Sequence, residues 1–133
     1  MFKYDLFLSF SGPDREFARV VAAELSARGR RVFFDEESIK TSARWVNELS
    51  RALEESRGVA AIVGGGAISA WQRAEVEHFL DLKRVDRSRA VIPVLRHGDL
   101  PDWPELFAHH AAKIGAGSPA EVASALHEAL RRL

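Results

Sequence analysis

The chain has 133 residues, of which 47% are hydrophobic and 29% are charged, a composition typical of one globular domain with a sizeable core. Lysine plus arginine equals aspartate plus glutamate at 19 each, so the charge balance gives no overall attraction to nucleic acid or to an anionic membrane. The chain has no cysteine, which excludes disulfides, a thiolate nucleophile and sulfur ligands for a metal.

Short apolar runs alternate along the chain with longer segments of helical period. The expected strands are residues 4–10, 31–35, 59–63, 90–95 and, more weakly, 111–114. This alternation predicts an α/β, flavodoxin-like three-layer fold: a five-stranded parallel sheet in the order 2-1-3-4-5, flanked by helices. We expect one domain over residues 1–133. A cytoplasmic location is also expected, because no apolar run is long enough to span a bilayer and no signal-peptide pattern precedes the first strand.

Four helices are expected between and after these strands. Each has a residue that can cap its first turn, and these cap residues are Asp14, Ser42, Ser69 and Ser118. Gln72 follows Ser69 at the spacing of a capping box. The first helix is predicted to end at Gly29 in the left-handed conformation, and the second to end at Gly58 before the third strand.

The third helix carries a carboxylate on its apolar side. At about 100° per residue, Glu75 falls between Trp71 and Phe79, whereas Glu77 projects to the polar side and is predicted to be solvated surface. Two interpretations of Trp71 and Glu75 stay open from the residues alone. They either border the core, with the carboxylate reaching water, or form a ligand pocket with an aromatic wall.

Two loops of small residues, 9–14 and 64–69, are predicted to meet where the order of the sheet reverses, between the first and third strands. Ligands of open α/β sheets bind at this point, beyond the carboxyl ends of the strands. Loop 9–14 enters a helix N-terminus, which favours phosphate, but Pro13 lacks an N–H and Asp14 adds negative charge. A phosphate cradle and a plain strand-to-helix turn therefore stay equally open.

Several other chemistries are disfavoured by the residues at these positions. A phosphoacceptor receiver domain needs acidic residues where this chain has Ser9 and Ser11, and an aspartate where the third strand runs into Gly64. A flavodoxin interpretation is supported only by the small-residue loop 9–14. His109 and His110 are adjacent and cannot readily share one metal, so no metal site is predicted. The chain also has no G-x-S-x-G nucleophile elbow.

Four segments follow one another in a specific order: Tyr4-Asp-Leu-Phe-Leu-Ser-Phe-Ser11, Arg31-Val-Phe-Phe-Asp35, Trp45 with Leu53-Glu-Glu-Ser56, and Ser69-Ala-Trp71 with Glu75. In order and spacing they resemble a Toll/interleukin receptor (TIR) domain, and Trp45 with W-x-x-x-E is similar to the bacterial branch. The resemblance implies that Glu75 is the catalytic glutamate of NAD-cleaving members. The implied reaction releases nicotinamide from NAD⁺ and leaves ADP-ribose or a cyclic isomer, with NAD⁺ as substrate and no separate cofactor.

The same resemblance implies the other site residues. Substrate contacts are expected from Phe10, Ser11, Asp35, Trp45 and Trp71. The BB loop is expected to supply interaction residues, and these are Glu37, Ser38, Ile39, Lys40 and Thr41. This loop lacks the glycine that the family often has near its end, and Ser11 stands where plant and animal members often have a basic residue.

Family behaviour further implies activation by self-assembly, in which the BB loop of one domain meets the pocket of its neighbour. A fused or partner sensor module and a role in bacterial antiphage defence are implied as well. No direct binding to nucleic acid or to a membrane is expected. The alternatives are a non-catalytic adaptor that binds other TIR domains and an effector that interferes with TIR signalling.

Overall fold

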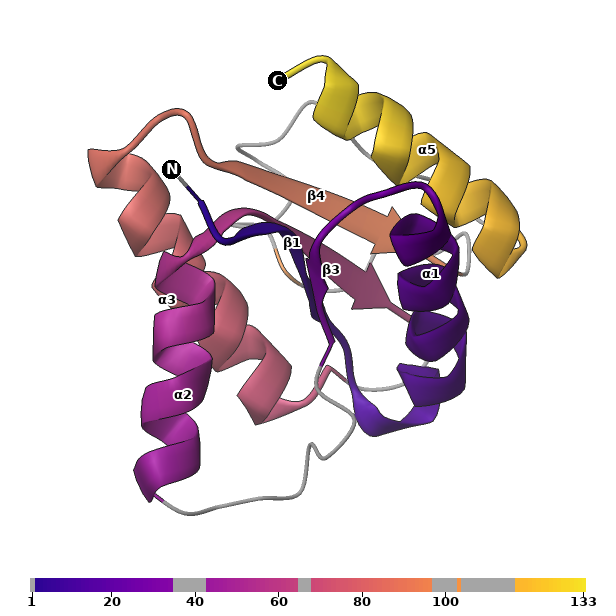
Figure 1. Ribbon diagram of the computed structural model, residues 1–133. Helices are drawn as coiled ribbons and strands as arrows, with labels where there is room; N and C mark the ends of the chain where they lie inside the picture. The colour runs from indigo at the N-terminus through magenta and orange to yellow at the C-terminus, as the bar shows by residue number, and fades with distance from the viewer. Residues whose placement is uncertain (1, 35–42, 65–67, 97–102, 104–116) are drawn as a thin grey trace.

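The computed structural model describes residues 2–34, 43–64, 68–96, 103 and 117–133, with residues 43–46 described by their backbone alone (Figure 1). The elements are β1 (Tyr4–Ser9), the short 3-10 helix η1 (Gly12–Asp14), α1 (Arg15–Ala27), β2 (Val32–Phe33), α2 (Ala43–Glu54), β3 (Ser56–Val63), α3 (Ala70–Val85), β4 (Ala90–Leu95) and α5 (Pro119–Arg131). Strands and helices alternate, as the apolar pattern predicts.

The described strands form one parallel sheet in the order β2-β1-β3-β4. Leu6 of β1 lies opposite Val32 of β2 on one side and Gly58 of β3 on the other. The α/β fold, the parallel pairing and the predicted order of the first four strands are confirmed. The predicted fifth strand, residues 111–114, lies outside the described residues.

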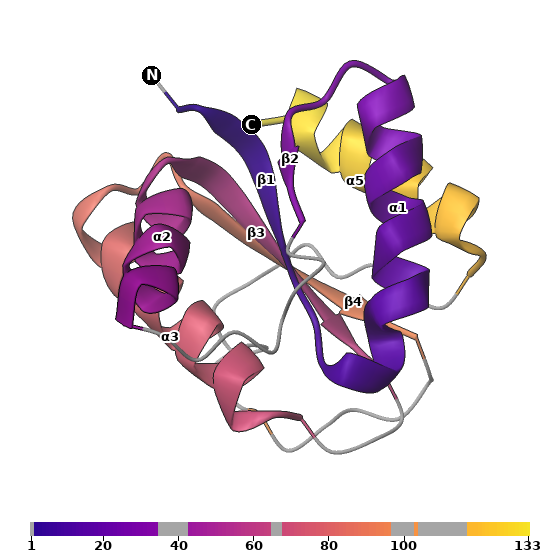
Figure 2. The same cartoon turned by 60° about the horizontal axis from the view of Figure 1, so that its bottom comes forward.

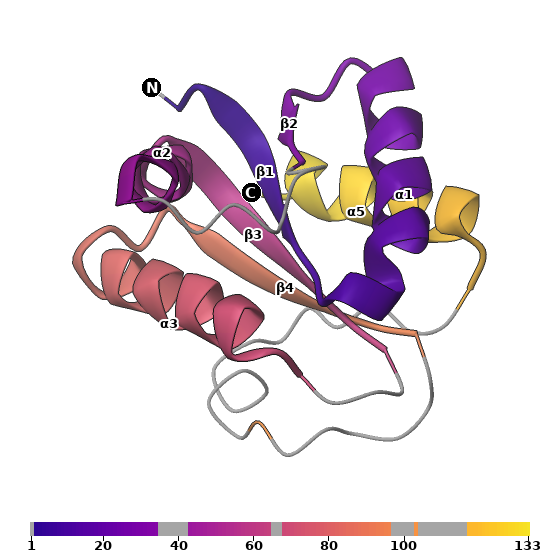
Figure 3. The same ribbon diagram turned by 90° about the horizontal axis from the view of Figure 1, so that it is seen from below.

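Helices cover both faces of this sheet. Helices α1 and α5 lie on one face and α2 and α3 on the other, as the turned views show (Figure 2 and Figure 3). The chain therefore changes face between the helix that follows β1 and the helix that follows β3. This change makes the boundary between β1 and β3 the switch point of the sheet.

Alternation along β1 divides its side chains between the two layers, because successive residues of a strand point to opposite faces. Leu6, Leu8 and Phe10 belong to the apolar cluster under α1 and α5. Phe7 belongs to the other cluster, under α2 and α3, and Ser9 points to the same side as Phe7. A polar residue at the end of β1 is thereby aimed at α3.

One predicted helix boundary is wrong, and one predicted cap residue stands at its place without forming the cap hydrogen bond. Gly58 does not end α2 but lies inside β3, where an added Cβ would come within 3.2 Å of the carbonyl oxygen of Ala90. The strand begins as early as Ser56, whose buried hydroxyl donates to the carbonyl of Ala52. Asp14 is the N-cap residue of α1, as predicted, but among the described residues its side chain makes no cap hydrogen bond, since its carboxylate turns to Arg96 instead. Gly29, in contrast, has the predicted left-handed conformation, with φ of +81°.

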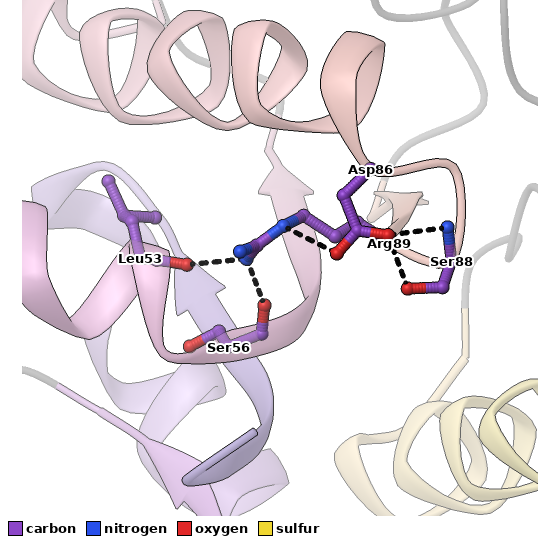
Figure 4. A network of polar contacts seen from close by, with 5 residues as sticks. All are labelled: Leu53, Ser56, Asp86, Ser88 and Arg89. Carbon is purple, nitrogen blue, oxygen red and sulfur yellow. Dashed lines mark hydrogen bonds and ion pairs between the residues drawn. The ribbon is translucent and has the colours of Figure 1, made fainter. Parts of the chain in front are cut away.

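Arg89 joins three elements at the end of the sheet opposite the strand carboxyl ends (Figure 4). Its guanidinium donates to the carbonyls of Leu53 and Ser56 at 3.4 and 2.8 Å, so it bridges the end of α2 and the start of β3. Asp86, in the turn before β4, lies 3.5 Å from Arg89 Nε and accepts two hydrogen bonds from Ser88.

Within the described part of the chain, no helix is both long and apolar enough to cross a membrane.

Candidate active site

The site is built at the start of α3, where five hydrogen bonds fix the helix against the preceding loop and the sheet. Ser69 caps the helix by accepting from the backbone N–H of Gln72 at 3.0 Å. The predicted capping box is thus half formed. The Gln72 side chain does not reach back to Ser69, because it turns into the molecule toward the strand ends, where it is 1% exposed.

Gln72 connects α3 to both central strands. Its amide nitrogen donates to the carbonyls of Ser9 at 3.1 Å and Ile62 at 2.7 Å, which belong to β1 and β3. Its amide oxygen accepts from the Ser11 hydroxyl at 2.8 Å, and that hydroxyl also accepts from the backbone N–H of Ser69 at 3.0 Å. The first turn of α3 is therefore held at a fixed place over the switch point.

Glu75 lies one turn further along α3, and its place confirms that it lies on the inner side of the helix. The residue is 9% exposed, and its Oε1 accepts a hydrogen bond from the hydroxyl of Ser9 at 2.9 Å. Ser9 itself is fully buried. Glu77, two residues on, is exposed as predicted. A buried carboxylate at this place exerts a strong electrostatic field on any ligand beside it, since water screens its charge little.

A cavity of about 210 Å³ opens beside Glu75, between α2 and α3. Its lining residues are Leu49, Ser50, Leu53, Trp71, Ala74, Glu75 and His78. Trp71 is 37% exposed and stands at this cavity with Glu75, so the structure favours the pocket interpretation over a carboxylate that reaches plain solvent. His78 brings an imidazole whose Nε2 is buried and lacks a hydrogen-bond partner among the described residues.

A second polar cluster closes the other side of the strand ends. Asp14 is 5% exposed, and its carboxylate pairs with Arg96 at 2.7 Å, directly after β4. The Arg96 guanidinium also stacks over the ring of Phe17, 4.3 Å from its centroid. Gly64, at the end of β3, packs its backbone directly against the Asp14 carboxylate. This cluster ties the loop after β1 to the ends of β3 and β4.

The structure brings some predicted site residues together and not others. Glu75 and Trp71 line one cavity, whereas Phe10 packs in the opposite layer, stacked on Phe34 with ring centroids 5.2 Å apart. Ser11 is 6% exposed, and the hydrogen of its hydroxyl is donated to Gln72. A direct contact of Phe10 or Ser11 with substrate stays a prediction.

The remaining predicted site residues stay predictions as well. Trp45 lies in the first turn of α2, where only the backbone is described. The other predicted positions lie outside the described residues, and these are Asp35, Glu37, Ser38, Ile39, Lys40 and Thr41. The described residues contain no group of three histidine, aspartate or glutamate side chains placed to hold a metal ion.

Sequence reasoning missed the residues that hold Glu75. The sequence places Ser9 where the first strand runs into a loop, and Gln72 in a capping box. Both are buried: Ser9 bonds to Glu75 of α3, and Gln72 bonds to the carbonyl of Ser9 in β1. One signal was present: a serine inside the apolar run Leu8-Ser9-Phe10 must be hydrogen-bonded if it is buried. Nothing in the sequence names its partner, which is 66 residues away.

The fold and this site define an α/β domain with a buried carboxylate, bonded to the end of β1, at a cavity between α2 and α3. The family model of the TIR domain matches residues 6–131, and the chain belongs to the TIR domain family. The resemblance noted in the sequence is thereby confirmed at the level of the family. Comparison with curated protein sequences finds no match.

Solved structures show the same fold at low sequence identity. A TIR-STING receptor from C. gigas is 18% identical with a TM-score of 0.72, and the match covers 97% of this chain and 40% of that chain. The CMP N-glycosidase BcmB of Clostridium botulinum is 14% identical with a TM-score of 0.68, covering 93% and 98%. The TIR domain heterodimer of RPS4 and RRS1 is 16% identical with a TM-score of 0.64, covering 96% and 93%.

Proposed function

We propose that this TIR domain is an NAD⁺ glycohydrolase that cleaves the bond between nicotinamide and ribose. The observation that carries the proposal is Glu75, a carboxylate 9% exposed that stands with Trp71 at one cavity and is held by a hydroxyl at the end of β1. A buried carboxylate fixed at the switch point of the sheet is the arrangement that a developing positive charge on a ligand needs.

The chemistry needs one carboxylate, because the leaving group is already cationic. The bond between ribose C1′ and the nicotinamide nitrogen breaks, and its electron pair passes to that nitrogen, so neutral nicotinamide leaves without being protonated. Glu75 stabilises the oxocarbenium-like ribose that remains. Water then adds at C1′ and loses a proton to give ADP-ribose, whereas attack by a group of the same nucleotide gives a cyclic isomer.

The cavity fits part of the substrate. Pockets that enclose drug-sized ligands span about 300–1,000 Å³, so a cavity of about 210 Å³ suits one end of a dinucleotide. We assign that end to nicotinamide and its ribose, with Trp71 beside the reacting groups. Phe10, Ser11, Asp35 and Trp45 keep their proposed roles toward the rest of the nucleotide.

Activity is proposed to depend on assembly with other TIR domains, through the BB loop residues 37–41. The heterodimer of RPS4 and RRS1 TIR domains shows that similar domains associate with one another, which supports this part of the proposal. Cytoplasmic antiphage defence in bacteria, together with a fused or partner sensor module, is the proposed setting.

Two other functions have their own support. The likeness to the CMP N-glycosidase favours cleavage of another N-ribosyl bond, although the cytosine attached to ribose in CMP is neutral, unlike the cationic nicotinamide group of NAD⁺, and must gain a proton to leave readily. A non-catalytic TIR–TIR interaction module, or an effector that interferes with TIR signalling, is favoured by family membership together with the heterodimeric relative.

One experiment separates these functions. The purified chain is incubated over a series of protein concentrations, with and without a crowding agent, and separately with NAD⁺ and CMP. Free base is measured by chromatography, and self-association is measured in the same samples. We expect nicotinamide from NAD⁺ at a rate per molecule that rises with protein concentration, and none from a folded Glu75→Ala variant.

Two results would overturn the proposal. Release of cytosine from CMP without release of nicotinamide would make the protein a nucleotide N-glycosidase of another specificity. No release of either base from samples that demonstrably self-associate would make it a non-catalytic interaction module.

A further inference from the structure

We propose that Ser9 is a positioning residue for Glu75, which it orients by its hydroxyl hydrogen bond from the end of β1. The inference deepens the proposed function and rests on it, because orientation of Glu75 matters to catalysis only if Glu75 acts on a substrate. It concerns a residue that touches the carboxylate rather than the reacting atoms.

The geometry of the pair carries the first step. Ser9 Oγ donates to Glu75 Oε1 at 2.9 Å, and the two residues are 0% and 9% exposed. A serine hydroxyl has one hydrogen, so this bond uses its whole donor capacity. A glutamate side chain has three rotatable bonds, and a donor fixed on a strand selects among the resulting positions of the carboxylate.

The donor is itself held rigidly, which is the second step. Ser9 pairs with Ala61 in the register of β1 and β3, and its carbonyl accepts from Gln72 Nε2 at 3.1 Å. The same amide nitrogen donates to Ile62 at 2.7 Å. Both ends of the Ser9–Glu75 bond are therefore anchored to one frame, since Gln72 fixes the helix that carries Glu75 to the strand that carries Ser9.

The choice of a hydroxyl is chemically suited to this role, which is the third step. A cationic donor such as arginine would orient the carboxylate but would also offset its negative charge, which the reaction uses against the positive ribose. A neutral hydroxyl gives orientation without adding a charge. The hydroxyl of Ser9 at the end of β1 therefore orients the Glu75 carboxylate and adds nothing to the apolar packing around it.

Ser56 provides a matched control for the loss of a buried serine hydroxyl. It is also fully buried, on the adjacent strand β3, and its hydroxyl donates to the carbonyl of Ala52 at 2.6 Å, near the opposite end of the sheet. Ser9→Ala and Ser56→Ala each remove one buried hydroxyl bond. A merely structural role for Ser9 therefore predicts equal effects of the two substitutions on activity.

The test compares kcat and KM for nicotinamide release by the wild type, Ser9→Ala, Ser9→Thr and Ser56→Ala, each shown to be folded by its melting curve. We expect Ser9→Ala to lower kcat by about tenfold or more with little change in KM, and Ser9→Thr, which keeps the hydroxyl, to recover most of that loss. Ser56→Ala should keep the wild-type kcat.

A second measurement keeps this inference separate from the proposed function. Crystal structures of Ser9→Ala and Ser56→Ala show whether the Glu75 carboxylate moves, whatever the activity of the wild type. We expect displacement or several rotamers of Glu75 in Ser9→Ala alone. An unmoved carboxylate, or equal kcat values for the two alanine variants, would overturn the role of Ser9. Displacement of Glu75 in a protein that cleaves no nucleotide would overturn the proposed function while keeping the contact that orients Glu75.

Discussion

Gly64 shows at the scale of one residue how closely the end of β3 packs against the loop after β1. An added Cβ would collide with the carboxylate of Asp14, which cannot move away freely because Arg96 holds it at 2.7 Å. We expect Gly64→Ala to lower the free energy of unfolding by about 1–3 kcal/mol, the usual cost of forcing extra atoms into a packed site. Chemical denaturation measures the difference.

Gly12 offers the control for this substitution. It lies in η1 of the same loop region, and a Cβ added there meets no atom within 4 Å in the described structure. Gly12→Ala should therefore change the free energy of unfolding by less than about 0.5 kcal/mol. Equal destabilisation by the two substitutions would show that Asp14 does not occupy the space beside Gly64.

Single residues also show where prediction from sequence stops. The burial of Glu75 and the exposure of Glu77 follow from helical periodicity, which depends on neighbours three and four residues away. The bonds of Glu75 to Ser9 and of Gln72 to Ser11 join residues 66 and 61 positions apart. No local pattern encodes such pairs, because they exist only once the helix has packed on the sheet.

At the scale of elements, Arg89 determines how α2, β3 and the turn before β4 meet. Its guanidinium donates to two carbonyls, and it also stacks on the rings of Phe2 and Phe79. Replacing Arg89 with methionine keeps much of the apolar stem but leaves the carbonyls of Leu53 and Ser56 without this donor. We expect a loss of about 1–3 kcal/mol in unfolding free energy, measured by urea denaturation.

Arg84 is the matched arginine for this test. It lies on the exposed side of α3 and pairs with Asp81 at 2.9 Å, with both side chains more than two thirds exposed. Such surface pairs contribute at most about 1 kcal/mol, so Arg84→Met should be nearly neutral. If Arg89→Met were as neutral as Arg84→Met, the junction that Figure 4 draws would not depend on Arg89.

Element boundaries were predicted less well than the elements themselves, for reasons visible at this same junction. The apolar run of β3 begins at Val59, but the strand begins at Ser56, because Ser56 and the Arg89 guanidinium satisfy polar groups that a sequence pattern assigns to a loop. The sequence predicts a helix end at Gly58, but Gly58 lies in β3, where the backbone of Ala90 comes so close that a side chain would have little room. β4, whose run is wholly apolar, begins and ends as predicted.

At the scale of the whole molecule, the order of four described strands could be predicted because short right-handed connections leave few alternatives. The layer assignment of Ser9 follows from the same topology. The shape of the cavity between α2 and α3 could not be predicted in this way. It depends on side chains from two helices, and no sequence pattern indicates which of them meet.

Resistance of the folded protein to acid should depend in part on Asp5, which joins β1 to the start of β2. Burial raises the pKa of Asp5, but hydrogen bonds from the backbone and guanidinium of Arg31, with the charges of Arg31 and Arg30, outweigh burial and leave the pKa below its ordinary value of 3.8. A lowered pKa in the folded state stabilises the protein above the ordinary value, and this stabilisation is lost as the pH falls through the folded-state pKa.

The variant Asp5→Asn removes this dependence while keeping an oxygen that accepts from the Arg31 backbone. We expect the wild type to exceed the variant in unfolding free energy by about 0.5 kcal/mol at neutral pH, a modest figure because the pair is partly exposed. The difference should shrink as the pH falls below the ordinary pKa of 3.8 and through the lower folded-state pKa. A difference that stays constant across this range, followed by urea denaturation, would contradict the assignment.

The most direct test of the central claim is the initial rate of nicotinamide release from NAD⁺ by Glu75→Gln and Glu77→Gln, compared with the wild type at one protein concentration. Both variants remove one negative charge from the same helix, but Glu75 is buried at the cavity and Glu77 is exposed. We predict a fall of about a hundredfold or more for Glu75→Gln and a rate within about twofold of the wild type for Glu77→Gln. Equal rates for the two variants would contradict the account.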